Sequence, residues 1–548
     1  MPITMDDSAF PTLTDEELRL IRPLGTVEDL ADGQTAFHAG DADIDLFVIE
    51  SGMLDILNPT DGNRVVVTHK PGTFTGDIDL ITRRPVIVTG VARGPTRVLR
   101  VPGNCLRQLL NRVPRFSEKF MIAFTLRREL LSRSGVLGLK VIGPGRCKDT
   151  NVVREFLYKN FVPFTWFDPE KEEGKALLVA FGSPRKSPVI ECGNGQVLLN
   201  PSLHELAKAA GIWRACPDRD VDFAIIGAGP AGIAAAVYAA SEGLSTIVLD
   251  RLGPGGQAGG SSRIENFIGF PAGLTGTELA TRGSLQMLRF GAAMAAPVSV
   301  QRIEPATMPG AAHTLHLDCG ATIRAPVVLI ATGVRWRKLE AEGADRFEGG
   351  GVHYVCTTVE AHLYDAGDVA VVGGGNSAGQ AAVFLAGCGP RRRVHVLVRR
   401  DFGSGMSEYL SSRIRATPNI VVHENTEITA IRGKRYVETL DLKNNLSGEV
   451  TTMPCGGVFV FIGADPAAAW LPDSIARDKL GYLLTGTDVV RTGAWPRTDR
   501  DPCPLETCLP GVLAAGDIRS GSTKRVGFAV GDGSLAVTCA HRLRGLIS

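Results

Sequence analysis

Two glycine-rich turns in this chain have the residue spacing that binds a dinucleotide. In such a turn the first glycine allows a tight bend, the second lets the backbone approach a pyrophosphate, and the third lets the next helix pack closely on the strand. The first turn comprises Gly227, Gly229, Pro230, Ala231 and Gly232. The second comprises Gly373, Gly375, Asn376, Ser377 and Ala378. Each turn follows an apolar strand, so the chain is expected to bind two dinucleotides.

The residues that end the next strand differ between the two turns. Asp250 follows the strand predicted at residues 245–249, and a carboxylate in that place bonds ribose hydroxyls, as in an FAD site. Arg399 and Arg400 follow the strand predicted at 393–398, where positive charge favours the 2′-phosphate of NADPH. Together the two turns predict hydride transfer to FAD from NADPH, with NADH as the alternative donor.

Two further strand ends carry residues suited to a flavin. They are Thr332 and Gly333 after the strand at 326–330, and Gly516 and Asp517 after the strand at 511–513. The Asp517 carboxylate is expected to bond a ribityl hydroxyl. The last helix opens with Lys524, Arg525 and Val526, where a positive charge would stabilise the reduced, anionic flavin.

These features resemble the low-molecular-weight thioredoxin reductase family over about residues 220–548. The resemblance includes Gly255-Gly256-Gln257 and Glu265-Asn266. It implies that Gln257 and Asn266 belong to the FAD site, and that the partner is a small redox protein or a disulfide. It also implies a homodimer. Rotation between domains would bring nicotinamide and substrate to the flavin in turn.

The chain departs from this family at its redox-active cysteines. Family members carry Cys-x-x-Cys ahead of the NADPH turn, and alignment on Gly373 places the first cysteine on Cys356 and the second on Val359. One thiol can form a mixed disulfide but cannot resolve it. Cys356 is therefore at most a single redox thiol. Cys503 and Cys508 are either a substitute pair or two unpaired thiols in a loop.

The first third of the chain has a different pattern of predicted strands and helices. From about residue 34 to residue 101 short apolar strands, among them 46–49 and 52–57, alternate with turns and predict a small β-roll. A helical stretch at 105–133 follows. This order resembles a cyclic-nucleotide-binding domain.

The resemblance places a phosphate-binding cassette at residues 76–86. The acid of the cassette is retained as Asp77, but Val86 stands where the phosphate-pairing arginine belongs. A buried phosphate without that bidentate partner would be held poorly. Either Arg83 or Arg84 replaces it from the other side of Pro85, or the roll has a structural or partner-docking role.

Residues 137–215 resemble a thioredoxin or glutaredoxin fold. Pro188 falls where such folds place a cis-proline. Near residues 145–150, where the active cysteine pair would lie, only Cys147 remains. Lys148 and a helix N-terminus would favour its thiolate, which allows a monothiol role. The alternative is a docking module that has lost the chemistry.

The predicted fold class is a multidomain α/β protein. Two Rossmann-like dinucleotide-binding domains, with the NADPH domain inserted into the FAD domain, follow a β-roll cyclic-nucleotide-binding-like domain and a small thioredoxin-like domain. The predicted boundaries are 1–135 for the roll, 136–215 for the thioredoxin-like domain, 220–337 and 463–548 for the FAD domain, and 338–462 for the NADPH domain.

Composition argues against several classes of partner. The 59 Lys and Arg residues nearly cancel the 58 Asp and Glu residues, so no overall field attracts nucleic acid or an anionic membrane. No apolar run reaches membrane-spanning length, and the first residues do not resemble a secretory signal. Eleven irregularly spaced cysteines fit reduced thiols in the cytoplasm and show no metal-ligand spacing.

Three functions remain open at this stage. The first is an NADPH-dependent FAD oxidoreductase that passes electrons to a redox partner or disulfide. The second is an activity like that of ferredoxin- or flavodoxin-NADP reductases, which need no cysteine pair. The third is a non-enzymatic sensor in which the flavin state drives the amino-terminal roll.

Overall fold

The computed structural model describes most of the 548 residues, although not the side chains of 132–133 and 358–359. The described residues are 8–59, 62–133, 138–182, 184, 186–193, 195–213, 218–308, 310–364, 367–389 and 391–545. The chain divides into two compact units. The first consists of Met1–Gly143, Val153–Ala215 and Leu285–Ala292; the second consists of Pro144–Val152, Cys216–Ser284 and Ala293–Ser548.

The predicted β-roll is present in the first unit as one antiparallel sheet. Its strands run in the order β1-β5-β3-β4, with β2 also paired to β5. They are β1 Thr26–Leu30, β2 Thr35–Phe37, β3 Leu46–Asn58, β4 Arg64–His69 and β5 Thr89–Val101. The two strands expected at 46–49 and 52–57 are therefore one strand. Its register shifts around Gly52, whose φ of +79° lets β3 bend without ending.

Three helices pack with the roll. They are α1 Asp15–Ile21, α3 Gly103–Arg112 and α4 Pro114–Arg133, so the helical stretch expected at 105–133 is two helices. Pro114 begins the second of these, where its missing N–H costs nothing. Helix α4 supplies Phe116, Phe120 and Phe124 to the core, and the Phe120 ring stacks on Phe74 with centroids 4.1 Å apart. This stacking fixes α4 against the loop that follows β4.

The third predicted block contains a four-stranded sheet in the order β7-β6-β8-β9. Its strands are β6 Leu139–Ile142, β7 Phe164–Phe167, β8 Val189–Glu191 and β9 Val197–Leu199, and its helices are α5 Lys148–Lys159, α6 Glu172–Ala180 and α7 Leu203–Ala209. Strands β6 and β7 are parallel and the other pairs antiparallel. The Ser187-Pro188 bond is cis. Both features are compatible with the thioredoxin-like resemblance, which stays a prediction.

A five-stranded sheet in the second unit contains the first dinucleotide turn. Its order is β13-β12-β11-β17-β28 and all its pairs are parallel. The strands are β11 Phe223–Ile226, β12 Thr246–Leu249, β13 Ala293–Ala295, β17 Val327–Ile330 and β28 Val512–Ala514. Because β28 completes the sheet that β11 begins, the predicted FAD segments 220–337 and 463–548 share one sheet.

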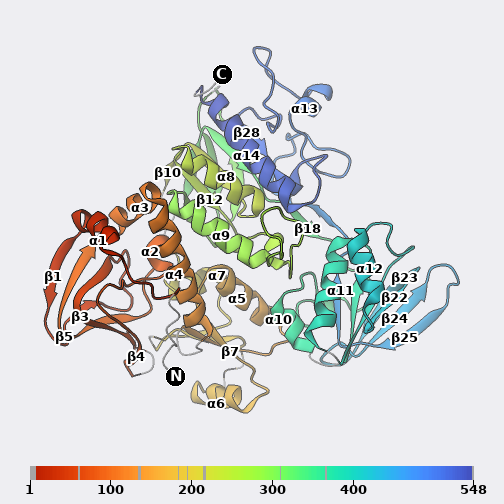
Figure 1. Ribbon diagram of the computed structural model, residues 1–548. Coiled ribbons are helices and arrows are strands. Elements are labelled where there is room, and N and C mark those ends of the chain that lie inside the picture. The colour runs from red at the N-terminus through yellow and green to blue at the C-terminus, as the bar shows by residue number, and fades with distance from the viewer. Residues whose placement is uncertain are drawn as a thin grey trace. The chain divides into compact units, whose positions relative to one another are not determined.

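Helices α8 (Pro230–Ser241) and α14 (Val526–Leu543) lie side by side beside this sheet (Figure 1). The two backbones approach closely at Gly533, where a Cβ would lie 2.3 Å from the Ala231 carbonyl oxygen. The last helix of the chain is thereby packed against the helix that follows the first glycine turn.

A second parallel sheet, in the order β19-β26-β20-β21-β22, contains the second glycine turn. It comprises β19 Val352–His353, β20 Gly367–Val372, β21 Arg392–Leu397, β22 Ile420–His423 and β26 Gly457–Val460, and it packs with α11 Asn376–Cys388 and α12 Glu408–Ala416. The connections to the first sheet, β18 (Val334–Trp336) and β27 (Ala464–Pro466), pair antiparallel. This pairing agrees with an inserted domain, although the exact boundaries stay predictions. Among the described residues, no helix combines the length and apolarity needed to cross a bilayer.

Candidate active site

The first glycine turn forms a backbone cradle at the N-terminus of α8. Gly227 has φ +107°, and a Cβ there would lie 2.4 Å from the Ala331 carbonyl oxygen. A Cβ on Gly232 would lie 1.9 Å from the Gly227 oxygen. Gly229 differs, because the nearest atom to its Cβ position is the Gly256 Cα at 4.0 Å. The space before Gly229 therefore fits a pyrophosphate at the helix N-terminus.

Asp250 ends β12 beside this cradle, as the sequence predicts. Its carboxylate accepts hydrogen bonds from three backbone N–H groups, those of Ala228, Leu252 and Gly253, each at 2.8 Å. These bonds hold the Asp250 side chain and the glycine turn together. Because the carboxylate is anchored at the carboxyl edge of the sheet, it is placed to bond a ribose as well as to shape the turn.

Other predicted FAD residues differ in how firmly they are held. Thr332 donates from Oγ1 to the Ala467 carbonyl at 3.1 Å, which joins the end of β17 to the segment after β27. Gln257 donates from Nε2 to the Val334 carbonyl. Asn266 is exposed in a loop, and no hydrogen bond to the described part of the chain fixes its side chain. Its contact with a flavin stays a prediction.

Asp517 lies just past β28 at the same edge of the sheet. Burial raises the pKa of its carboxyl group, although the nearby Lys524 ammonium opposes that shift. Lys524 donates to the Asp517 carbonyl and, at 3.0 Å, to Ser522 Oγ, while burial lowers the pKa of Lys524. Arg525 is exposed at the N-cap of α14. A carboxyl and the Lys524 ammonium therefore meet where the flavin is expected.

Asp532 is a residue of this edge that sequence reasoning missed. Its Oδ2 accepts from the Gly516 N–H at 2.9 Å, and both carboxylate oxygens lie 3.1 Å from the Arg519 guanidinium. Asp532 thus fixes the turn that presents Asp517. The available signal was the acid between Gly531 and Gly533 in the last helix, a position where a buried side chain approaches the sheet.

The second glycine turn forms a backbone cradle like that of the first glycine turn. Gly373 has φ +141°, and a Cβ there would lie 2.3 Å from the Phe461 carbonyl oxygen and 3.3 Å from the Ala378 Cβ. Gly375 is the N-cap of α11, and the exposed Ser377 lies in the first turn of that helix. Asn376 Oδ1 accepts from the Ser407 N–H at 2.7 Å, which ties the turn to the loop before α12. The cradle fits the pyrophosphate of a pyridine nucleotide.

Arg399 and Arg400 lie just past β21, next to this second cradle. Both side chains are exposed, and within the described residues neither guanidinium has a hydrogen bond or an ion pair. The preceding Val398 is buried. The two arginines are therefore free to pair with a phosphate at the ribose end of a bound nucleotide.

Comparison with known proteins supports the same conclusion. The family described as pyridine nucleotide-disulphide oxidoreductase matches residues 221–533, which is more than half of the chain. The chain belongs to this family. A second family, described as cyclic nucleotide-binding domain, matches residues 27–113 and confirms the predicted identity of the roll.

The family resemblance extends to thioredoxin reductases over their whole length. Thioredoxin reductase of Treponema pallidum is 32% identical over 324 residues, which cover 59% of this chain and 97% of that protein. The NADH dehydrogenase of Bacillus subtilis is 29% identical over 347 residues, 63% of this chain and 62% of that protein. The solved Lactococcus lactis thioredoxin reductase superimposes with a TM-score of 0.53 at 28% identity, over 60% of this chain and all of that one.

These findings confirm the predicted family, fold class and cofactors. This oxidoreductase is a thioredoxin reductase-like, NAD(P)H-dependent flavoprotein, and such family members use FAD and NADPH. The fold implies a disulfide or a thioredoxin-like redox partner. The two family matches, to residues 221–533 and 27–113, leave the thioredoxin-like block outside their ranges, so that block stays a prediction.

Cys356 is in an environment that suits a thiol rather than a thiolate. The residue is 4% exposed and belongs to the core under α11. Burial raises the pKa of its thiol well above the usual range, and the Glu360 carboxylate raises it further. Buried thiols of this kind are poor nucleophiles. The side chain of Val359, at the position of the missing second cysteine, lies outside the described residues.

Cys503 and Cys508 are both free thiols, which agrees with the alternative of two unpaired thiols in a loop. Cys503 shares a side-chain hydrogen bond with Cys539 of α14, which lowers the pKa of the Cys503 thiol. Cys508 instead accepts from the Ala476 N–H at 3.1 Å. The thiol neighbour of Cys503 is therefore Cys539, a residue that sequence reasoning missed. Cys147 lies directly before α5, and the adjacent Lys148 ammonium is 3.4 Å from the Glu348 carboxylate.

Val86 occupies the phosphate-pairing position of the cassette, and the charged groups beside it have partners within the protein. Asp77 lies 2.6 Å from the Arg128 guanidinium, so its carboxylate is already paired. Val86 lines the cavity of the roll. Arg83 faces Asp43 at 3.8 Å, and Arg84 donates to a backbone carbonyl of the third block. Neither arginine lines the cavity.

We expect no useful binding of cyclic AMP or cyclic GMP to the roll, because Val86 stands where the phosphate-pairing arginine belongs and neither Arg83 nor Arg84 lines the cavity. Calorimetry with the full chain should show no saturable heat for either nucleotide. Arg84→Ala should behave like the wild type. Micromolar binding in the wild type that disappears in Arg84→Ala would contradict the expectation and show that Arg84 has taken over the phosphate.

Proposed function

We propose that this chain is an NADPH-dependent flavoprotein reductase whose electrons leave for a separate redox partner without an internal cysteine pair. The observation that carries the proposal is the state of the cysteine motif. Val359 replaces the second cysteine, and Cys356 is buried with a raised thiol pKa. The two dinucleotide cradles, in contrast, keep the features that binding requires.

The residues of the chain bind and orient the two nucleotides. The N–H groups at the start of α8 and Asp250 would hold the adenosine half of FAD, while Asp517 and Lys524 would meet its other half. Arg399 and Arg400 would select the 2′-phosphate. When bound, FAD would supply the two-electron chemistry that joins NADPH to the acceptor. Hydride transfer needs no acid–base residue, because the protein contributes by positioning the two nucleotides and excluding water.

A screen of acceptors tests this proposal. The FAD-loaded chain is mixed with NADPH and, separately, with thioredoxin disulfide, one-electron iron–sulfur proteins, quinones and oxygen. We expect weak turnover with disulfides, slower by roughly tenfold or more than with the best one-electron acceptor, because the resolving thiol is missing. This outcome would support the proposal and would identify the separate partner as a one-electron redox protein, as for ferredoxin- or flavodoxin-NADP reductases.

Cysteine variants give the screen its control. Serine replacement of Cys356 should remove the weak disulfide turnover if that thiol is a relay. Replacement of Cys503 and Cys508 should remove it if those two residues act as a substitute redox pair. Thioredoxin reduction that stays robust after Cys147, Cys356, Cys503 and Cys508 are all removed would contradict this account of the cysteines. A chain inactive with every acceptor would point to the sensor alternative.

We also propose a cytoplasmic homodimer. All ten cysteines that the structure describes are free thiols, which suits a reducing compartment. The dimer rests on the resemblance to thioredoxin reductases, and light scattering of the purified chain tests it.

A further inference from the structure

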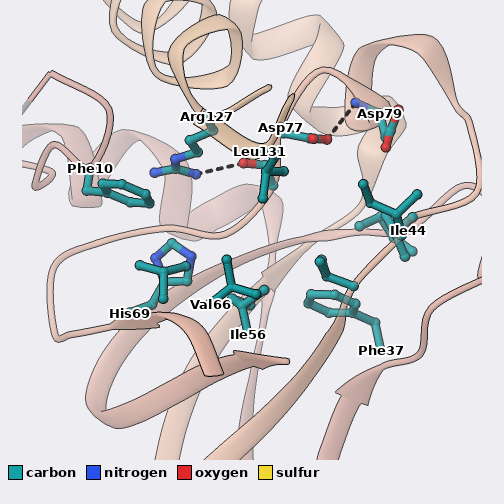
Figure 2. Close-up of a pocket in the computed structure, with 15 residues that line it drawn as sticks. Phe10, Phe37, Ile44, Ile56, Val66, His69, Asp77, Asp79, Arg127 and Leu131 are labelled. Carbon is teal, nitrogen blue, oxygen red and sulfur yellow. Dashed lines mark hydrogen bonds between the residues drawn. The ribbon is translucent and has the colours of Figure 1, made fainter. Parts of the chain in front are cut away.

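The β-roll has a partly open cavity of about 60 Å³ with mostly apolar walls (Figure 2). Phe37, Ile56, Val66 and Val86 are among the side chains that line it. Phe10, from the segment before α1, lies at one end of the cavity. Such a lining suits the hydrophobic body of a small molecule and leaves few partners for sugar hydroxyls.

Most polar groups at this cavity already have partners in the protein. Asp77 and Asp79 both pair with Arg128. His69 lies with Nδ1 3.4 Å from Thr73 Oγ1, and burial together with the positive charge of Arg127 keeps the pKa of His69 well below its ordinary value. His69 is therefore a neutral ring at neutral pH. These groups add no uncompensated charge to the cavity wall.

Arg127 is the exception. Its Nε donates to the Ala9 carbonyl and its Nη1 to the Gly76 carbonyl, both at 2.7 Å. Its Nη2 is buried and, among the described residues, has no hydrogen-bond partner. The residue is 5% exposed, and its guanidinium lies between the rings of Phe10 and Phe74, at 5.0 and 4.6 Å.

The described part of the chain thus holds a desolvated cation with no acceptor for its outer amino group. Burial lowers the pKa of Arg127 to about 9, which reflects the lack of a directly bonded carboxylate. A buried donor without a partner is unfavourable unless another molecule completes it. An anionic acceptor would do so best, because hydrogen bonds between charged groups are stronger than neutral ones.

We propose that the roll binds a small hydrophobic carboxylate. Its apolar body would contact Ile56, Val66 and Val86, and its carboxylate would accept hydrogen bonds from Arg127 Nη2. The inference goes beyond the reductase activity and does not depend on it. It gives the amino-terminal domain a ligand of a class different from cyclic nucleotides, recognised by one arginine within an apolar cavity.

Calorimetry on the full chain at neutral pH tests the proposal with hexanoate and benzoate as probes. Hexanamide and benzamide are the neutral controls of nearly the same shape, and cyclic AMP is the competitor. We expect saturable binding of at least one carboxylate. The matching amide should bind about tenfold more weakly or worse, because it cannot form the charged hydrogen bond.

Two variants locate the site. Arg127→Met removes the donor, and Val66→Phe fills the cavity from the opposite wall and leaves Arg127 in place. Both should weaken carboxylate binding by about tenfold or more, whereas Arg83→Met, an exposed arginine outside the cavity, should bind like the wild type. Thermal melting shows whether each variant folds. If Arg127→Met does not fold, binding by Val66→Phe tests the proposed site.

Several results would overturn the proposal. They are the absence of binding by either carboxylate, equal affinity for carboxylate and amide, and undiminished binding in folded Arg127→Met or Val66→Phe. Tighter binding of cyclic AMP than of both carboxylates would overturn it as well and would assign the cavity to nucleotides.

Discussion

Gly229→Ala should remove FAD binding without destabilising the protein. The Cβ of alanine at position 229 would meet nothing nearer than the Gly256 Cα at 4.0 Å, and the backbone there has φ −75°. The apoprotein should therefore unfold as readily as the wild type or be more stable by about 0.4–1 kcal/mol, as for other compatible Gly→Ala changes. The added methyl group would occupy the place where a pyrophosphate must approach the backbone. The purified variant should therefore carry little or no FAD.

Gly232→Ala is the matched control for that variant. Its Cβ would lie 1.9 Å from the Gly227 carbonyl oxygen, so the fold itself must shift, at a cost of about 1–3 kcal/mol or more. Apoprotein melting and bound FAD measured by absorbance after gel filtration separate the two effects. A yellow Gly229→Ala protein with wild-type flavin content would mean that the cradle does not hold the pyrophosphate.

Replacing Arg399 and Arg400 together by alanine should erase a preference for NADPH over NADH. Both guanidinium groups are exposed and unpaired within the described chain, so the change costs no internal contact. Each charged hydrogen bond to the 2′-phosphate is worth about 1.5–3 kcal/mol, so kcat/KM for NADPH should fall by roughly tenfold to a hundredfold or more. The value for NADH should hardly change, because NADH lacks that phosphate.

Arg393→Ala provides the control for net charge. Arg393 is also exposed but lies near the other end of β21, away from the glycine turn. It should keep the nucleotide preference of the wild type. Equal rates with NADPH and NADH in the wild type would refute the assignment of the two arginines.

The dinucleotide edges could be predicted from the sequence because their geometry is local. Gly227 and Asp250 follow directly on strands, Asp517 lies three residues past the end of β28, and a parallel sheet brings the carboxyl ends of its strands to one edge. Short apolar runs in the sequence therefore identify the strand ends that carry site residues, even where these strands are hundreds of residues apart in the chain. The single strand β3 was missed because Gly52 and the bulge around it have the composition of a turn.

Contacts between distant segments could not be predicted in this way. The hydrogen bond between the Cys503 and Cys539 thiols depends on how α14 packs against the loop before β28. Arg127 Nη2 has no partner within the described residues because the other guanidinium nitrogens bond the Ala9 and Gly76 carbonyls, and no spacing rule predicts those bonds. Alignment on Gly373 shows that Val359 stands where the family has its second cysteine. Only the packing shows that the remaining Cys356 is buried.

The most direct test of the central claim is the anaerobic reduction of the bound flavin by NADPH, compared between the wild type and Cys356→Ser. The yellow absorbance should bleach rapidly and to the same extent in both proteins, because positioning of the nicotinamide requires no thiol. The Cys356→Ser rate should stay within about twofold of the wild type. A variant that binds FAD and NADPH normally but bleaches orders of magnitude more slowly would contradict the account, because it would place a thiol in the reduction of the flavin itself.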